Sequence, residues 1–313
     1  MRFVIVQPSW DHSEILTSLL YFIKNNNHQV KIIYDWSHPE GNYLDYLCNL
    51  NGFDDSIKIN YKSPKFHVKN LQNAHKIIFV DEIHLKKFLS KQTFRNMIHK
   101  MYTFNHITKK INWDIKVLNL GLIPFNRCIN TNKFLVNNLY NPQIDIKYKL
   151  NPIKKYLIVG NPSYRELSFL EKLNDNLNIE INFVVRKPLE INKPFLKIHQ
   201  NLSTTKLIEM IRDTDFILTL FKTNSVYHKD RISGIIPFAI SFGKPIITDK
   251  TYNDLTKSSN NLIYTNTFDN FKNIIDTTIN MSNNTYSNLV KNIIKYRDNK
   301  IIEQYLNFNL IFN

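Results

Sequence analysis

The stretch RISGIIPFAISFGKPIITD, residues 231–249, decides the fold of this chain. Its apolar middle predicts a short helix that is buried nearly all round. Gly243 ends such a helix as a C′ residue, and the Lys-Pro pair after it prevents continuation. The Ile-Ile-Thr run that follows predicts a buried strand with Asp249 at its carboxyl end. Backbone amides at Ser233 and Gly234 would then converge as a site for a phosphate or diphosphate.

This stretch resembles the donor-site segment of glycosyltransferases with the GT-B fold. In that family a Ser-Gly loop opens a short helix, which ends in Gly-Lys-Pro and a strand, and the segment holds the diphosphate of a nucleotide sugar. Many retaining members have two glutamates where this chain has Asp230 and Phe238. The resemblance is therefore to the subgroup that uses Ser-Gly instead. Related epimerases of nucleotide sugars carry a similar run.

The composition is that of a globular protein with a strong positive charge. A length of 313 residues predicts about two domains. Hydrophobic residues make up 43% and charged residues 21%, which indicates a packed core. The net charge of +15 favours anionic partners, namely nucleotide sugars, anionic lipid surfaces or nucleic acid. Lysine, asparagine and isoleucine are all abundant, so the codon bias of an AT-rich genome is an alternative source of part of this charge.

Cysteine usage and hydropathy predict a reduced, cytoplasmic protein. Cys48 and Cys128 are the only cysteines, and no Cys/His cluster has metal-ligand spacing. The chain begins directly with a predicted strand, so we expect no signal peptide. No apolar run approaches the roughly 20 residues needed to span a bilayer.

Two series of alternating strands and helices predict an α/β protein with two Rossmann-like, doubly wound domains. The first begins at the apolar run of residues 3–6 and takes in residues 1–150, which we assign to the acceptor. The second begins at residues 156–160 and takes in residues 151–313, which we assign to the nucleotide-sugar donor. The resemblance implies that the domains face a cleft and that a terminal helix, within 285–311, crosses back to the first domain.

Apolar runs and capping residues place further elements within the two series. Strands are predicted at residues 30–34, 76–80, 114–120, 180–185, 195–199, 215–220 and 261–264. Helices are predicted near residues 43–50, over one or two segments of 83–110, and at 163–176 and 203–212. A polar stretch at 125–153, bracketed by two Asn-Pro pairs, predicts an extended linker.

Small and basic residues near the predicted phosphate turn are candidates for donor binding. Arg165, in the loop after the first strand of the second domain, suits this role because a guanidinium binds phosphate bidentately. The basic loop before Ser233 would neutralise the leaving diphosphate without a metal. The complete set of donor-binding candidates is Gly160, Ser163, Arg165, Arg186, Lys229, Arg231, Ser233 and Gly234.

Asp11, His12 and Asp81 follow strands of the first domain and are the catalytic candidates. An inverting enzyme needs a general base near the acceptor hydroxyl, whereas a retaining enzyme of this fold needs none, so the stereochemical outcome stays open. An Asp-x-Asp pair at residues 213–215 matches a metal motif of the other large glycosyltransferase fold. That motif follows a strand, whereas this pair precedes one. We therefore predict no metal and no other cofactor, with a UDP- or GDP-sugar as substrate.

The resemblance implies a hexosyltransferase-like, metal-independent enzyme. It would move a sugar from a nucleotide-diphosphate donor to an acceptor hydroxyl of a glycan, lipid or protein. The alternatives are a nucleotide-sugar epimerase of the same fold, a DNA-base glucosyltransferase, and a non-catalytic glycosyltransferase-like scaffold. From the positive charge we also expect peripheral contact with a membrane surface, and nucleic acid is not excluded as a partner.

Overall fold

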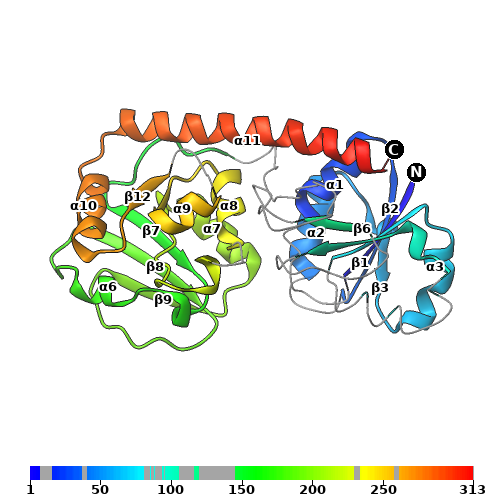
Figure 1. The fold of residues 1–313 in the computed structure, drawn as a ribbon, viewed down its shortest axis with the longest axis horizontal. Helices are drawn as coiled ribbons and strands as arrows, with labels where there is room; N and C mark the ends of the chain where they lie inside the picture. Colours follow the sequence, from blue (N-terminus) through cyan, green and yellow to red (C-terminus); the bar gives the residue numbers. More distant parts are fainter. Residues whose placement is uncertain are drawn as a thin grey trace. The chain divides into compact units, whose positions relative to one another are not determined.

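The computed structural model describes the chain except for residues 8–15, 37–40, 81–84, 86–87, 89–93, 95, 106–115, 120–144, 229–232, 257–260 and 313. The chain divides into two compact units, coloured along the sequence in Figure 1. Unit 1 comprises Met1–Gln143 together with Ile301–Asn313, and unit 2 comprises Ile144–Lys300.

Unit 1 is built on a parallel sheet with the strand order β3-β2-β1-β4-β5-β6. Its strands are β1 (Arg2–Gln7), β2 (Gln29–Tyr34), β3 (Lys58–Asn60), β4 (Lys76–Phe79), β5 (Met101–Asn105) and β6 (Lys116–Asn119). Its α-helices and 3-10 helices are α1 (Leu16–Asn25), α2 (Gly41–Leu50), η2 (Asp55–Ile57), η3 (Pro64–His67), α3 (Val68–Gln72) and η4 (Ile98–Lys100). Strand β1 has partners on both sides, and its apolar run is therefore buried.

Unit 2 repeats this plan with the strand order β12-β11-β10-β7-β8-β9, again parallel throughout. Its strands are β7 (Lys154–Val159), β8 (Ile179–Val185), β9 (Leu196–Gln200), β10 (Phe216–Leu218), β11 (Ile246–Asp249) and β12 (Leu262–Tyr264). Its helices are η5 (Pro162–Tyr164), α6 (Ser168–Lys172), α7 (Thr204–Asp213), η6 (Val226–His228), α8 (Ile235–Ser241), α9 (Lys250–Thr256), α10 (Phe268–Ile279) and the start of α11 (Asn283–Phe312).

Both sheets have the doubly wound order that the sequence predicted, in which the order of strands reverses beside the first strand. In unit 2, α6 and α10 lie on one side of the sheet and α7 and α8 on the other (Figure 1). The rings of Phe169 and Phe271 stack at 5.4 Å between centroids where α6 meets α10. The predicted fold class of two Rossmann-like α/β domains is confirmed.

The decisive stretch folds as predicted. Helix α8 is buried on nearly every side, and Phe242 caps its end. Gly243 follows with φ +64°, a left-handed conformation that suits glycine. A Cβ on Gly243 would also lie 3.0 Å from a methyl carbon of Ile294, so helix α11 approaches this turn closely. Strand β11 then begins and is buried along its whole length.

Two local predictions were wrong or incomplete. The segment 163–176 is not one helix, because η5 and the five-residue α6 are separated by an extended stretch at Arg165. Arg165 is drawn out of helical geometry by pairing with Phe221 of a distant loop. The segment 83–110 contains strand β5 at its end, where only helices were predicted.

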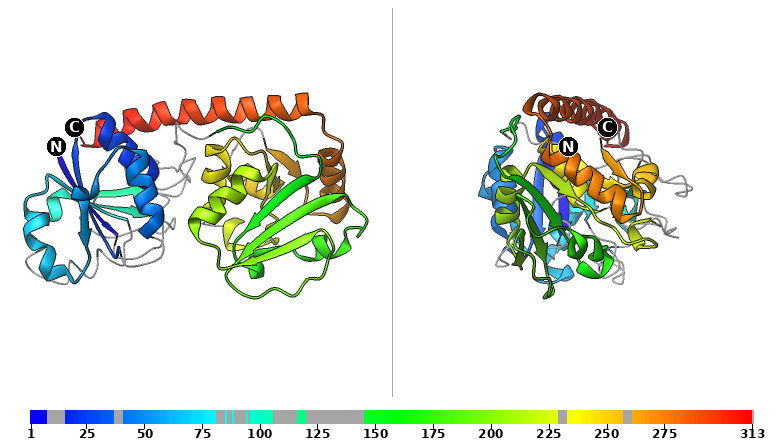
Figure 2. Two further views of the ribbon diagram at one scale, coloured as in Figure 1. Left: turned by 180° about the vertical axis from the view of Figure 1, so that it is seen from behind. Right: turned by 90° about the vertical axis from the view of Figure 1, so that its left-hand side faces the viewer.

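The predicted terminal helix is α11, and it contributes to both units (Figure 2). Within unit 2, the Tyr286 hydroxyl donates to the carbonyl of Asp215 at 3.1 Å. Within unit 1, the ring of Phe308 stacks on Phe3 of β1, with 5.9 Å between centroids. The return of this helix to the first domain is part of the predicted fold and is confirmed.

Candidate functional site

The strands of unit 2 end together at one edge of its sheet, which we call the carboxyl edge; the opposite edge is the amino edge. Strands β7 and β10 are neighbours in the sheet although β8 and β9 lie between them in the sequence. Doubly wound sheets bind ligands at such a point, where the strand order reverses. The loops that follow β7 and β10 therefore define the candidate site.

A short antiparallel bridge joins these two loops. Arg165 and Phe221 are bridge partners, and the Glu166 N–H donates to the Leu220 carbonyl at 2.8 Å. Leu220 has φ +48°, a left-handed conformation that is uncommon for residues other than glycine. The bridge therefore holds a strained backbone in place, which is a feature of many functional sites.

The Arg165 side chain lies inside the carboxyl edge, with 1% of its surface exposed. Its Nη1 donates to the Thr219 carbonyl at 2.9 Å, and its Nη2 donates to the Val159 carbonyl. The guanidinium carbon lies 4.5 Å from the ring centre of Phe221, a cation–π geometry. Burial lowers the pKa of Arg165 to about 10. The guanidinium thus ties the ends of β7 and β10 together, and its predicted contact with a diphosphate stays a prediction.

Gly160 makes room for this arginine. Its φ of +123° lies in a region that other residues avoid, and a Cβ would stand 2.7 Å from Nη2 of Arg165. The sequence predicted Gly160 as a donor-binding residue. The structure gives it a packing role, and a contact with donor stays a prediction.

Ser163 and Arg186, also predicted to bind the donor, are exposed at the carboxyl edge. Ser163 lies in η5, where its N–H and its hydroxyl both donate to Oδ1 of Asn161, at 3.0 and 2.9 Å. Arg186 directly follows the last residue of β8. Both residues therefore lie at the edge of the sheet where we expect a ligand to bind.

The predicted phosphate turn lies at the start of α8. The Ser233 N–H donates to the Tyr252 hydroxyl at 3.2 Å, and Ser233 is 5% exposed. Gly234 is exposed, and within the described residues its N–H has no hydrogen-bond partner. The amide of Ser233 is thus already used, whereas that of Gly234 keeps its capacity to bind an anion.

Asp249 ends β11 and is fully buried. Its Oδ1 accepts a hydrogen bond from the Tyr252 N–H at 2.9 Å. Nε2 of His228 lies 3.0 Å from Oδ1 and 3.1 Å from Oδ2 of the same carboxylate. The position of Asp249 after a strand was visible in the sequence. Its pairing with His228 was missed, because that residue lies in another loop, 21 positions away.

The remaining predicted site residues lie outside the described part of the chain. They are the catalytic candidates Asp11, His12 and Asp81, together with Lys229 and Arg231 of the basic loop before Ser233. Their roles stay predictions.

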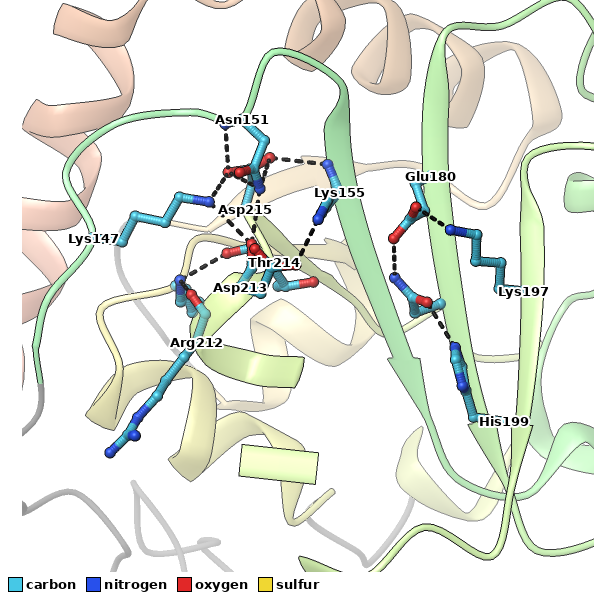
Figure 3. A network of polar contacts seen from close by, with 12 residues as sticks. Lys147, Asn151, Lys155, Glu180, Lys197, His199, Arg212, Asp213, Thr214 and Asp215 are labelled. Atoms are coloured by element: carbon cyan, nitrogen blue, oxygen red, sulfur yellow. Dashed lines mark hydrogen bonds and ion pairs between the residues drawn. The ribbon is translucent and has the colours of Figure 1, made fainter. Parts of the chain in front are cut away.

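The Asp-x-Asp pair lies at the amino edge (Figure 3). Asp215 is fully buried. Its carboxylate accepts hydrogen bonds from the Lys147 ammonium group at 3.1 Å and from the backbone N–H groups of Asn151 and Lys155, at 3.1 and 2.9 Å. Asp213 pairs with the Lys155 ammonium group at 2.6 Å. Both carboxylates therefore have partners already, and they precede β10 as the sequence indicated.

The described residues offer neither a metal-binding cluster nor a membrane-spanning helix. They contain no group of three or more His, Cys, Asp and Glu side chains arranged to hold a metal ion. Each helix in the described part of the chain is too short or too polar to cross a bilayer.

No protein-family model matches this chain, and no match to its sequence is found among curated proteins. Solved structures match its fold. HepE of Anabaena, in complex with UDP and glucose, has a TM-score of 0.64 at 10% identity over 99% of both chains. An α-glucosyltransferase in complex with UDP-glucose and DNA containing an abasic site has a TM-score of 0.63 at 10% identity over 95% of both chains. The UDP-GlcNAc 2-epimerase of Neisseria meningitidis, bound to UDP-GlcNAc, has a TM-score of 0.54 at 11% identity, covering 98% of this chain and 99% of its own.

These likenesses extend over nearly the whole chain and so include both units. At such low identity they show the fold, which is the predicted GT-B fold of two parallel-sheet α/β domains. A fold by itself does not fix an activity, since function depends on the site that a fold carries.

Proposed function

We propose that this protein is a glycosyltransferase that moves a hexose from a UDP- or GDP-sugar to an acceptor hydroxyl of a glycan, lipid or protein. Unit 2 would bind the donor. The whole-chain likeness to HepE, which was solved with UDP and glucose, and to a glucosyltransferase bound to UDP-glucose supports this proposal.

The observation that carries the proposal is the convergence of several segments at the carboxyl edge of unit 2. The loops after β7 and β10 and the start of α8 all lie there, at the point where doubly wound sheets bind nucleotides. Gly234 offers an amide that has no hydrogen-bond partner among the described residues, and Ser163 and Arg186 are exposed at the same edge. Such groups suit the phosphates of a nucleotide better than a neutral ligand.

The chemistry requires stabilisation of a leaving nucleoside diphosphate. As the bond between the sugar and the phosphate oxygen breaks, its electron pair moves to that oxygen, and hydrogen-bond donors and cations offset the charge. We assign this role to the Gly234 amide and to Lys229 and Arg231 of the preceding loop. Asp11, His12 and Asp81 are the residues that we propose for the acceptor side.

We propose that this transfer needs no metal. The Asp-x-Asp pair, which is the metal motif most evident in the sequence, has its carboxylates engaged by Lys147 and Lys155 at the amino edge. Activity that survives exhaustive chelation is the expected result. Activity that is lost with chelator and restored by Mg²⁺ or Mn²⁺ would contradict this part of the proposal.

Isothermal titration with UDP, GDP and their common hexose conjugates tests donor binding. Gly234 has φ −59° and ψ −22°, which alanine adopts without strain, so Gly234→Ala and Gly234→Asp form a matched pair. We expect Gly234→Ala to bind near wild-type affinity. Gly234→Asp should bind at least about tenfold more weakly, because its carboxylate would repel the diphosphate. Failure of the wild-type protein to bind any of these nucleotides would overturn the proposed function.

Incubation of the bound donor without an acceptor separates transfer from epimerisation. A glycosyltransferase leaves the donor largely unchanged until an acceptor is added. Conversion of the donor sugar to its epimer, with no acceptor present, would instead assign the epimerase activity of one of the structural neighbours.

A DNA base is the second candidate acceptor. The net charge of +15 favours a polyanion, and a structurally similar glucosyltransferase was solved with DNA. Binding of a duplex should then weaken steeply with salt, since each neutralised phosphate contributes about −0.9 to the logarithmic slope. Transfer to DNA containing hydroxymethylated bases would establish this acceptor, and an absence of transfer would exclude it.

A further inference from the structure

A histidine and an aspartate form a nearly sealed pair at the carboxyl edge. Nε2 of His228 faces both carboxylate oxygens of Asp249, at 3.0 and 3.1 Å. The two side chains are 6% and 0% exposed. The backbone N–H of His228 donates to the Ser225 carbonyl at 3.0 Å, which fixes the base of the side chain as well. The ring therefore has a defined orientation.

The charge of Asp249 makes this pair more than a packing contact. A buried carboxylate is stabilised only by hydrogen bonds or an opposite charge. Among the described residues, His228 is the ionisable group that pairs with Asp249, and the other contact is a backbone N–H. A protonated imidazole would balance the carboxylate and would carry a second N–H at Nδ1.

The other ring nitrogen of His228 is Nδ1. Within the described residues it has no hydrogen-bond partner. The neighbours of the ring are Phe221, at 6.1 Å between centroids, and the Asp249 carboxylate. Nδ1 is not one of the fully buried polar atoms that lack a partner, so it reaches the surface of the edge, where a ligand atom can accept a hydrogen bond from it.

Tyr252 links this pair to the predicted phosphate turn. Its backbone N–H donates to Asp249, while its hydroxyl accepts the Ser233 N–H at 3.2 Å. The pair and the turn are thus held by opposite ends of one buried residue. Both therefore belong to the carboxyl edge, where we propose that the donor binds.

We propose that His228, oriented by Asp249, binds the diphosphate of the donor through Nδ1–H. This rests on the proposed function. His228 would touch the ligand and offset the charge that the phosphate oxygen gains when the bond to the sugar breaks, without transferring a proton. Asp249 acts through the ring and is a positioning residue.

Paired titrations with UDP and uridine test this contact, because the two probes differ only in the diphosphate. His228→Gln should weaken UDP binding about 10- to 100-fold, the range of a charge-assisted hydrogen bond, and leave uridine binding unchanged. His199→Gln is the matched control. That ring also has its Nε2 in a hydrogen bond, to Asn182 at 2.7 Å, but on the outer strand β9. It should bind both probes normally. GDP and guanosine replace these probes if the protein prefers guanine.

Asp249→Asn tests the positioning role. An asparagine keeps an oxygen for the Tyr252 N–H, so the start of α9 is preserved. UDP binding should weaken by less than in His228→Gln, and the double variant should lose no more than His228→Gln alone, since both changes act through the same ring. Additive losses would show that Asp249 acts independently and would overturn its role.

A measurement on the unaltered protein avoids any dependence on variant folding. The ring C–H resonance of His228 should shift in NMR spectra when UDP is added and stay in place with uridine. Equal shifts with both probes, or equal losses of UDP and uridine affinity in His228→Gln, would overturn the inference but leave the proposed function intact. A wild-type protein that binds neither UDP nor GDP would overturn both.

Discussion

In the described part of unit 2, two aspartates are completely buried, one at each edge of the sheet, and their surroundings differ. Asp215 at the amino edge receives hydrogen bonds from the Lys147 ammonium group and from backbone and side-chain amides (Figure 3). Asp249 at the carboxyl edge receives one backbone N–H, from Tyr252, and the ring of His228. The first carboxylate accepts several hydrogen bonds from an ammonium group and from amides. The Asp249 carboxylate depends instead on the ring of His228, whose Nδ1 has no hydrogen-bond partner among the described residues and so has capacity to bind a ligand.

Buried cations repeat the contrast. At the amino edge, Lys244 donates to the carbonyls of Arg212 and Thr214, at 2.8 and 2.7 Å, and so caps the end of α7. At the carboxyl edge, Arg165 donates to the carbonyls of Val159, which ends β7, and Thr219, which follows β10, and it stacks on Phe221. Lys244 thus caps a helix at the amino edge, whereas Arg165 fixes two loops in position for a ligand at the carboxyl edge.

Asp215→Ala is expected to have the largest effect on stability. It leaves Lys147 and several amides without their shared acceptor, and breaking a buried pair of this kind costs about 3–5 kcal/mol. Urea titration measures the loss in the free energy of unfolding. Hydrogen exchange should locate the loss in unit 2, and UDP affinity of the folded fraction should be unchanged.

Asp213→Ala is the control for that prediction. Its side chain is 60% exposed and pairs with Lys155 at the surface, so the expected loss is below about 1 kcal/mol. Equal losses for the two aspartates would show that the amino edge does not depend on the buried carboxylate.

Gly160→Ala should be the next most damaging change, and it tests the carboxyl edge. The new methyl group would meet Nη2 of Arg165 at 2.7 Å in a backbone conformation of φ +123°. Strain and displacement together should cost about 3 kcal/mol. Gly52 also has a positive φ, +67°, but the atoms nearest to a Cβ there belong to the flexible end of Lys24, at 3.9 Å. Gly52→Ala should therefore lower the free energy of unfolding by only about 1 kcal/mol. Thermal unfolding of both variants decides whether the arginine contact adds to the strain.

The parts of the fold that local patterns determine could be predicted from the sequence. Apolar runs located the central strands, and Gly243 with its positive φ marked the end of α8. The failures came from long-range pairing. Arg165 is extended because Phe221, in a loop after another strand, pairs with its backbone, and no pattern near residue 165 signals that bridge.

The candidate site divides in the same way. Ser233 and Gly234 were predicted from a local motif, whereas Asp249 was placed at the end of a strand without a role in the site. The burial of Arg165 was missed, because its acceptors belong to two strands that only the sheet order brings together. The use of the Ser233 amide by the Tyr252 hydroxyl was missed because Tyr252 lies 19 positions away, on helix α9 beyond β11.

Lys244 predicts a pH-dependent contribution to stability at the amino edge. Burial, and secondarily the charge of Lys147, lower the pKa of Lys244 from 10.5 to about 7. Between these two values the unfolded chain binds the proton more tightly than the folded protein does. The free energy of unfolding should therefore rise with pH across this window, by up to about 1.4 kcal/mol per pH unit. As pH falls towards 7 this gain in stability is lost, because the buried Lys244 side chain must then bind a proton. Lys244→Met should remove this slope. Urea titrations of both proteins at pH 7, 8 and 9 measure it, and parallel profiles would contradict the prediction.

The smallest expected effect concerns two hydroxyls at the carboxyl edge. Oγ1 of Thr219 on the loop after β10 lies 3.0 Å from Oγ1 of Thr248 on β11, and both residues are buried. Thr219→Val and Thr248→Val should each cost about 1 kcal/mol, because each leaves the other hydroxyl without that partner. The double variant removes both groups, so it should cost less than the sum of the single variants by about 0.5–1 kcal/mol. UDP affinity should stay within about twofold of wild type in all three, since these hydroxyls bond to each other and not to the ring of His228. A tenfold loss of UDP affinity in Thr248→Val would instead show that the binding surface extends to the buried strand β11. The Thr219–Thr248 pair would then act in ligand binding as well, and it would no longer differ in role from the His228–Asp249 pair.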